Sequence, residues 1–230
     1  MAGLDYTTRD KVLWGALAAL CLASAAAYVF WALPAMPETV PTHWGVDGSV
    51  NGWSDKGSTV FMGVIMPILM LVLLFAVPFF DPRGASFNRF KGIYQGFSAA
   101  FTVFMVVVAW ITPLSALGVL PAAGGSFVNV IVFGFLGLLL VCLGVAMPHI
   151  EPNYTFGVRV PWTLADPENW RRTHRFAGPV FVIMGVVTLV SAFLASVAPE
   201  LTLVVLLVAL LGGVALVTLY SFLLWKGVIR

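Results

Sequence analysis

Long apolar stretches, each free of Asp, Glu, Lys and Arg, dominate the pattern along this 230-residue chain. The stretches do not alternate apolar and polar positions, so they predict helices rather than the strands of a membrane barrel. A helix crosses the hydrocarbon core of a bilayer with about 20 mostly apolar residues. On that basis the pattern predicts six membrane spans, at about 12–33, 57–80, 93–117, 127–147, 176–198 and 201–225.

The boundaries of the central and last spans rest on residues that interrupt helices. The charge-free stretch from 92 to 150 is too long for one crossing, and its middle contains several turn-forming residues: Gly118, Pro121, Gly124 and Gly125. Only Pro199 and Glu200 separate the last two spans, which predicts a tight turn there. Small residues within two spans predict close helix packing, namely Gly15, Ala19 and Ala23 in the first and Gly134, Gly137 and Gly144 in the fourth.

Composition supports a membrane protein. Hydrophobic residues make up 60% of the chain and charged residues only 10%, whereas soluble domains carry about 25% charged residues. The net charge of +2 is too small to favour a nucleic-acid partner. Cys21 and Cys142 both lie in apolar runs without metal-binding spacing, so we interpret them as packing residues. The predicted fold class is therefore an all-α membrane protein, a single domain over residues 1–230 that forms a six-helix bundle.

The distribution of basic residues predicts the orientation of this bundle. If the N-terminus is cytoplasmic, Lys56 alone lies outside, and all other basic residues lie inside: Arg9, Lys11, Arg83, Arg89, Lys91, Arg159, Arg171, Arg172, Arg175, Lys226 and Arg230. Cytoplasmic loops carry an excess of Lys and Arg. The first apolar run exceeds the usual core of a signal peptide, so we expect it to be retained as a helix. These features predict a multi-pass plasma (inner) membrane protein with both termini in the cytoplasm.

Residues 34–56, called loop 34–56 here, form a long connection that this orientation places outside the cell. Pro37 and Pro41 argue against a helix in it, and several glycines allow turns. Its candidate functional residues are His43, Trp44, Asp47, Asn51, Trp53 and Asp55. His43 and Asp47 are suitable ligand types for a metal, but they do not make a complete zinc site. The alternative is that both side chains form hydrogen bonds within turns.

Residues 148–175, called loop 148–175 here, form the second long connection, which the orientation places in the cytoplasm. Asp166 is a suitable helix N-cap, Pro167 suits the first helical position, and the helix can continue into the fifth span. The candidate functional residues are Asn153, Phe156, Gly157, Arg159, Pro161, Trp162, Trp170, Thr173 and His174. We expect them to hold the loop against the bundle, with docking of a cytoplasmic partner as the alternative. An ion pair of Arg159 with Asp166 or Glu168 is part of this expectation.

Two segments resemble known sequence signatures. The run P-N-Y-T-F-G-V-R-V-P-W-T-L, with W-R-R-T-H-R-F-A-G after it, resembles the signature of the SdpI-like family of bacterial membrane proteins. The run V-P-T-H-W-G, with N-G-W-S-D-K after it, resembles the domain of unknown function found at the N-terminus of that family. The family pattern has Thr or Ser after Arg159, where this chain has Val160. The resemblance implies an immunity protein that protects the cell against a secreted antimicrobial peptide toxin, with a second role in signalling to a cytoplasmic repressor.

Two other classes of function stay open at this point. The first is a membrane enzyme or metal-binding protein that uses His43 and Asp47, although the chain contains no recognisable nucleophile–base pair, H-E-x-x-H motif or phosphate loop. The second is a transporter of small molecules or lipids. The predicted spans contain no Asp, Glu, Lys or Arg, and this absence argues against a transporter. We therefore predict a protein that is not an enzyme, has no cofactor and has the lipid bilayer, a toxin and a repressor as partners.

Overall fold

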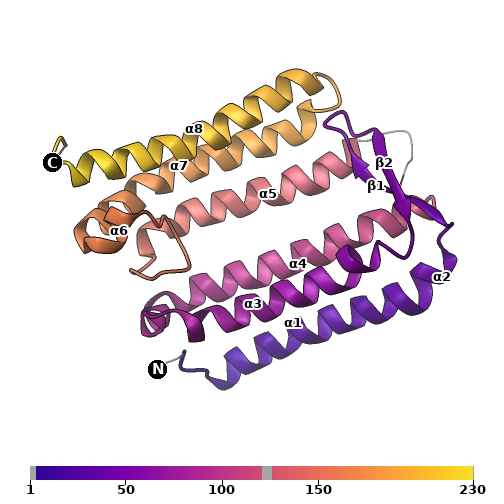
Figure 1. Ribbon diagram of the computed structural model, residues 1–230, viewed down its shortest axis with the longest axis horizontal. Helices are drawn as coiled ribbons and strands as arrows, with labels where there is room; N and C mark the ends of the chain where they lie inside the picture. The colour runs from indigo at the N-terminus through magenta and orange to yellow at the C-terminus, as the bar shows by residue number, and fades with distance from the viewer. Residues whose placement is uncertain (1–3, 121–125, 230) are drawn as a thin grey trace.

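The structure of the chain is a computed structural model that describes residues 4–120 and 126–229. Six of its helices are long and apolar enough to cross a membrane. They lie side by side as one bundle, with neighbouring helices roughly parallel or antiparallel (Figure 1). The chain is thus an all-α, multi-pass membrane protein, as the apolar pattern predicts.

The observed helices overlap all six expected spans. In chain order, α1 (Thr8–Ala27) continues through a π-helical turn (Tyr28–Ala32) into α2 (Leu33–Ala35). A second π-helical turn (Phe61–Ile65) leads into α3 (Met66–Phe80). The other long helices are α4 (Lys91–Ala116), α5 (Ser126–Ala146), α7 (Pro167–Leu194) and α8 (Pro199–Trp225). The short helix α6 (Pro161–Ala165) precedes α7. Among the residues expected to separate α4 from α5, Gly118 has a positive φ of 71°. Pro121, Gly124 and Gly125 lie outside the described residues.

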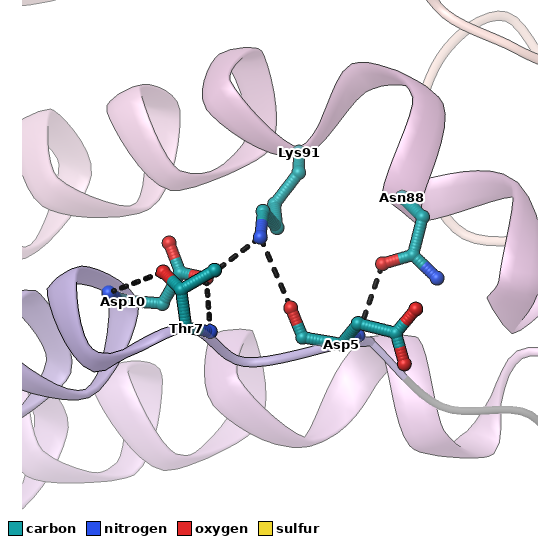
Figure 2. A network of polar contacts seen from close by, with 5 residues as sticks. All are labelled: Asp5, Thr7, Asp10, Asn88 and Lys91. Atoms are coloured by element: carbon teal, nitrogen blue, oxygen red, sulfur yellow. Dashed lines mark hydrogen bonds and ion pairs between the residues drawn. The ribbon is translucent and has the colours of Figure 1, made fainter.

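Helix α1 begins earlier than the expected start at residue 12, because its first turn is capped. The Thr7 hydroxyl accepts from the Asp10 N–H, and the Asp10 carboxylate accepts from the Thr7 N–H. The Asp10 carboxylate also lies 2.7 Å from the Lys91 Nζ, and Lys91 donates to the backbone carbonyl of Asp5 (Figure 2). The N-terminal segment is therefore fixed to the beginning of α4.

The turn between the last two helices lies earlier than expected. Pro199 and Glu200 form the first turn of α8 rather than the connection, and residues 195–198 make the turn. Proline suits the first turn of a helix because a backbone N–H at that position would have no partner within the helix, so its absence costs nothing. A carboxylate suits the positive end of the helix dipole. The expectation of a Pro199–Glu200 turn was therefore wrong.

Glycines bring α5 and α7 into close contact. A Cβ added to Gly137 would lie 2.8 Å from the Gly185 carbonyl oxygen, and one added to Gly144 would lie 2.7 Å from the Gly178 carbonyl oxygen. Only glycine permits such backbone approach between helices. Gly15 and Gly134, in contrast, have open space around them. The expected close packing is therefore found at Gly137 and Gly144 but not at Gly15 or Gly134.

The two ends of the bundle differ in structure (Figure 1). Both termini, α6 and loop 148–175 lie at one end, here called the terminal end. The two strands β1 (Thr39–Trp44) and β2 (Val50–Asp55) lie at the other, here called the hairpin end. A core of buried aromatic residues forms near the terminal end, including Trp14, Phe87, Tyr94 and Trp170. The bundle therefore presents two separate structured surfaces, one at each end.

Candidate functional site

Loop 34–56 forms an antiparallel β-hairpin, which sequence analysis did not predict. Thr39 pairs with Asp55, and Pro41 pairs with Trp53. At the turn, the Gly48 N–H donates to the Gly45 carbonyl, and Gly48 has a positive φ of 77°. The Asp47-Gly48 pair between two runs rich in β-branched and aromatic residues was a signal that could have indicated this hairpin.

The hairpin leaves most of the candidate residues exposed. Exposed and half-buried positions alternate along β2, so Asn51, Trp53 and Asp55 are exposed. From β1, His43 is exposed as well, and its ring is hydrogen-bonded to Asn51. Trp44 is half-buried instead. Trp53 keeps 61% of its surface exposed, which leaves a large amphipathic side chain available at the hairpin end.

Hydrogen bonds within the hairpin occupy His43 and Asp47. The Nδ1 of His43 is paired with the Oδ1 of Asn51. The Asp47 carboxylate accepts from both the N–H and the hydroxyl of Ser49. These two bonds, that of the hydroxyl first, hold the pKa of Asp47 below its ordinary value. The described residues contain no group of three His, Cys, Asp or Glu side chains that could hold a metal ion.

The hairpin is fixed to the helices beneath it. The buried Asn129 of α5 donates from Nδ2 to the Val46 carbonyl at 2.7 Å. Lys56 forms an ion pair with Glu38 and donates to the Met36 carbonyl. At the base of the hairpin, the Tyr28 hydroxyl donates to the Thr59 hydroxyl at 2.7 Å. Contacts with α5 and with both ends of the loop therefore hold the exposed face in one position.

At the terminal end, Asn153 organises the beginning of the signature sequence. Its side chain is fully buried. The amide Nδ2 donates to the carbonyls of Glu151 and Phe156, and Oδ1 accepts from the N–H groups of Thr155 and Phe156. The half-buried ring of Phe156 packs against Tyr94 and Phe97 of α4. Asn153 thus closes a tight turn, and Phe156 attaches the turn to the bundle.

Asp81, which was not among the predicted site residues, holds this turn from the opposite side. It directly follows α3 and is 6% exposed. Its Oδ2 accepts from the Tyr154 N–H at 2.8 Å and from the Thr155 hydroxyl at 2.7 Å, while Oδ1 accepts from the Arg83 N–H. Its position between an apolar run and Pro82 suggested a helix end, but no sequence pattern indicated a partner more than 70 residues away.

His174 links loop 148–175 to α7. Its buried ring stacks on Trp170, with ring centroids 4.1 Å apart. Nε2 accepts from the Val158 N–H, and Nδ1 lies 2.9 Å from the Trp170 carbonyl. Because one nitrogen faces a donor and the other an acceptor, this geometry requires a neutral imidazole with its proton on Nδ1. Gly157, with a φ of 112°, leaves the space that this ring occupies.

The other predicted residues of loop 148–175 make structural contacts. The Arg159 side chain donates to the Tyr154 carbonyl, whereas Glu168 forms an ion pair with Arg171 and Asp166 caps α7. The expected pairing of Arg159 with Asp166 or Glu168 was therefore wrong, because both carboxylates serve the first turn of their own helix. The remaining candidates are Pro161, which begins α6, Trp162, which packs against Phe222 and Trp225, Trp170, which donates to the Ile150 carbonyl, and Thr173, which donates to Asn169.

Known protein families match the two structured segments of the chain. The SdpI/YfhL protein family matches residues 149–221, and a domain of unknown function (DUF1648) matches residues 19–71. The chain is similar to "Immunity protein SdpI" of Bacillus subtilis (strain 168), with 28% identity over 193 residues that cover 83% of this chain and 86% of that protein. No solved structure matches the chain. The chain thus resembles the SdpI/YfhL family in the signature sequence of loop 148–175, resembles DUF1648 in the segment that contains loop 34–56, and aligns with one immunity protein along most of both chains.

Proposed function

We propose that this chain is an immunity protein, without enzymatic activity, that protects its cell against a secreted antimicrobial peptide. The observation that carries this proposal is the similarity to an immunity protein along 83% of the chain. The segment that matches DUF1648, residues 19–71, contains the hairpin. The segment that matches the SdpI/YfhL family, residues 149–221, contains Asn153 and His174. Both structured ends of the bundle thus lie within the matched segments.

The proposal includes an orientation with the terminal end in the cytoplasm and the hairpin end outside. The distribution of Lys and Arg supports this orientation, because loop 34–56, which the structure describes in full, contains Lys56 and no other Lys or Arg. The basic residues of loop 148–175 and the N-terminal segment lie at the opposite end (Figure 1). Cytoplasmic loops of bacterial membrane proteins carry this excess of positive charge.

In this orientation the exposed hairpin face meets the toxin. Trp53 provides an aromatic anchor of the kind that dominates protein–peptide contacts. Asn51 lies two residues before it on the same face of β2 and is hydrogen-bonded to the exposed His43. Because Asn129 and Lys56 fix the hairpin to the bundle, little ordering is needed when a peptide binds. Loop 148–175 carries the second role, contact with a cytoplasmic repressor, through the side chains that stay exposed there, such as Arg159, Pro161 and Arg171.

Survival of toxin-sensitive cells tests the proposal. This chain is expressed in Bacillus subtilis that lacks its own SdpI and is grown together with the toxin-producing parent strain. We expect survival to increase, and we expect Trp53→Ala to remove the increase. Trp31→Ala is the matched control, because it removes another exposed indole, 56% exposed, from a helix rather than from the hairpin. Unchanged survival with the chain present in the membrane would contradict the proposal.

A further inference from the structure

An apolar groove of about 380 Å³ separates two helices near the terminal end. Helix α4 contributes Gly92, Gly96 and Ala100, and α5 contributes Leu139, Cys142 and Ala146. Gly92, Gly96 and Ala100 recur every four residues and therefore form one face of α4. From Gly92 to Ala100 the groove follows the helix axis for roughly 12 Å, at 1.5 Å per residue. The groove is therefore long, narrow and parallel to the bundle axis.

An ion pair joins the chain segments just beyond the two walls of this groove, although neither partner lines it. Arg89 lies three residues before Gly92, and Glu151 follows the end of α5, so the two side chains join the same pair of helices. The Arg89 Nη1 lies 3.6 Å from the Glu151 Oε2, and the two side chains are 74% and 41% exposed. A long, exposed pair of this kind is weak in itself. Both groups therefore keep hydrogen-bonding capacity for a ligand at this level.

From these observations we propose that the α4–α5 groove binds one zwitterionic glycerophospholipid, of the phosphatidylethanolamine type. One acyl chain lies along the groove between Gly96 and Cys142. The phosphate accepts hydrogen bonds from the Arg89 guanidinium, and the ammonium group donates to the Glu151 carboxylate. The pair of opposite charges at the mouth matches a headgroup that carries both charges.

The size of the groove argues against a protein helix as its occupant. A helix about 10 Å wide that rises 1.5 Å per residue fills roughly 120 Å³ per residue. The volume of about 380 Å³ equals that of roughly three helical residues, less than one turn, so a docked helix would lie almost entirely outside the groove. A flexible hydrocarbon chain is thin enough to lie along the groove, and the part of the chain that extends past the groove can continue into the bilayer. A lipid in this groove does not depend on the immunity role, so the two proposals can fail separately.

Lipid uptake by the purified full-length chain tests this inference. The delipidated protein in detergent is titrated with phosphatidylethanolamine, phosphatidylglycerol or diacylglycerol, and bound lipids are counted by native mass spectrometry. We expect one phosphatidylethanolamine per chain at concentrations at least tenfold lower than those needed for the other two lipids. Arg89→Gln and Glu151→Gln should each abolish that preference, because each removes one headgroup contact.

Variants of the groove distinguish lipid binding at this site from nonspecific binding of lipid to the protein surface. Gly96→Leu should raise the phosphatidylethanolamine concentration needed at least tenfold, because its side chain fills the groove. Gly134→Leu is the matched control, since Gly134 also has open space around it and does not line the groove. Ala146→Leu, on the opposite wall, replaces Gly96→Leu if the latter does not elute as a folded protein. Equal uptake by the groove variants and the control, equal uptake of all three lipids, or a dimer that Gly96→Leu dissociates would each overturn the inference.

Discussion

The imidazole of His174 occupies the space that a side chain on Gly157 would need, since an added Cβ would lie 2.5 Å from Nε2. Gly157 also has a φ of 112°, a backbone conformation that residues with a side chain rarely adopt. We therefore expect Gly157→Ala to destabilise the protein by about 1–3 kcal/mol, seen as a lower unfolding temperature in detergent. Gly134→Ala, a helical glycine with free space, is the control and should not lower that temperature. Equal stability of the two variants would show that loop 148–175 adjusts freely.

Asp81 should control the stability of loop 148–175. Asp81→Ala leaves the N–H groups of Arg83 and Tyr154 and the Thr155 hydroxyl without their acceptor. A fully buried donor without a partner costs about 1–3 kcal/mol; these three hydrogen bonds are part-buried, so each loss costs less, but together they should make the loop open more often. We expect faster trypsin cleavage after the exposed Arg159. Asp55→Ala, which removes a turn-forming carboxylate at the hairpin end, should leave the cleavage rate at Arg159 unchanged; acceleration by both variants would point to global unfolding instead.

The helices of this fold could be predicted from sequence better than the contacts between them. A bilayer requires about 20 apolar residues per helix, and that requirement leaves a clear pattern in the chain. The hairpin has short strands with a bulge, at His43, that interrupts regular alternation, so its pattern is weak. Asp81 and Tyr154 meet only because the bundle brings the ends of α3 and α5 together. Asp166 was identifiable as an N-cap because its partner, the Glu168 N–H, is two residues away.

Helices α5 and α7 should separate when bulk is added at their closest approach. An added Cβ on Gly185 would lie 2.6 Å from the Gly137 carbonyl oxygen, which is backbone and cannot rotate away. Gly137→Val and Gly185→Val should each lower the unfolding temperature strongly and reduce the yield of folded protein in size-exclusion chromatography. Gly134→Val, three residues before Gly137 on the same helix, should behave like the unmodified protein. A Gly137→Val variant with unchanged stability would contradict the packing of α5 against α7.

The proposed orientation predicts which engineered thiols react from outside the cell. In a Cys142→Ala background, Ser49→Cys places an exposed thiol in the hairpin turn, and Glu168→Cys places one at the start of α7. A maleimide that cannot cross membranes should label Ser49→Cys in intact cells and Glu168→Cys only after the cells are opened. Cys21 is buried and stays unreactive in both variants. Labelling of Glu168→Cys in intact cells would reverse the orientation and with it the roles proposed for the two ends.

The Asp10–Lys91 pair should couple the N-terminal segment to α4 more strongly than a surface ion pair does. The side chains are 7% and 22% exposed and 2.7 Å apart, whereas those of Glu168 and Arg171 are both 55% exposed. Loss of one partner leaves the other shielded from water without a counter-charge, which is unfavourable. Asp10→Ala and Lys91→Met should therefore each lower the unfolding temperature, and the double variant should lose less than the sum. The corresponding variants of Glu168 and Arg171 should show little such coupling. Additive losses for Asp10 and Lys91 would mean that the pair seen in Figure 2 contributes no more than an exposed contact.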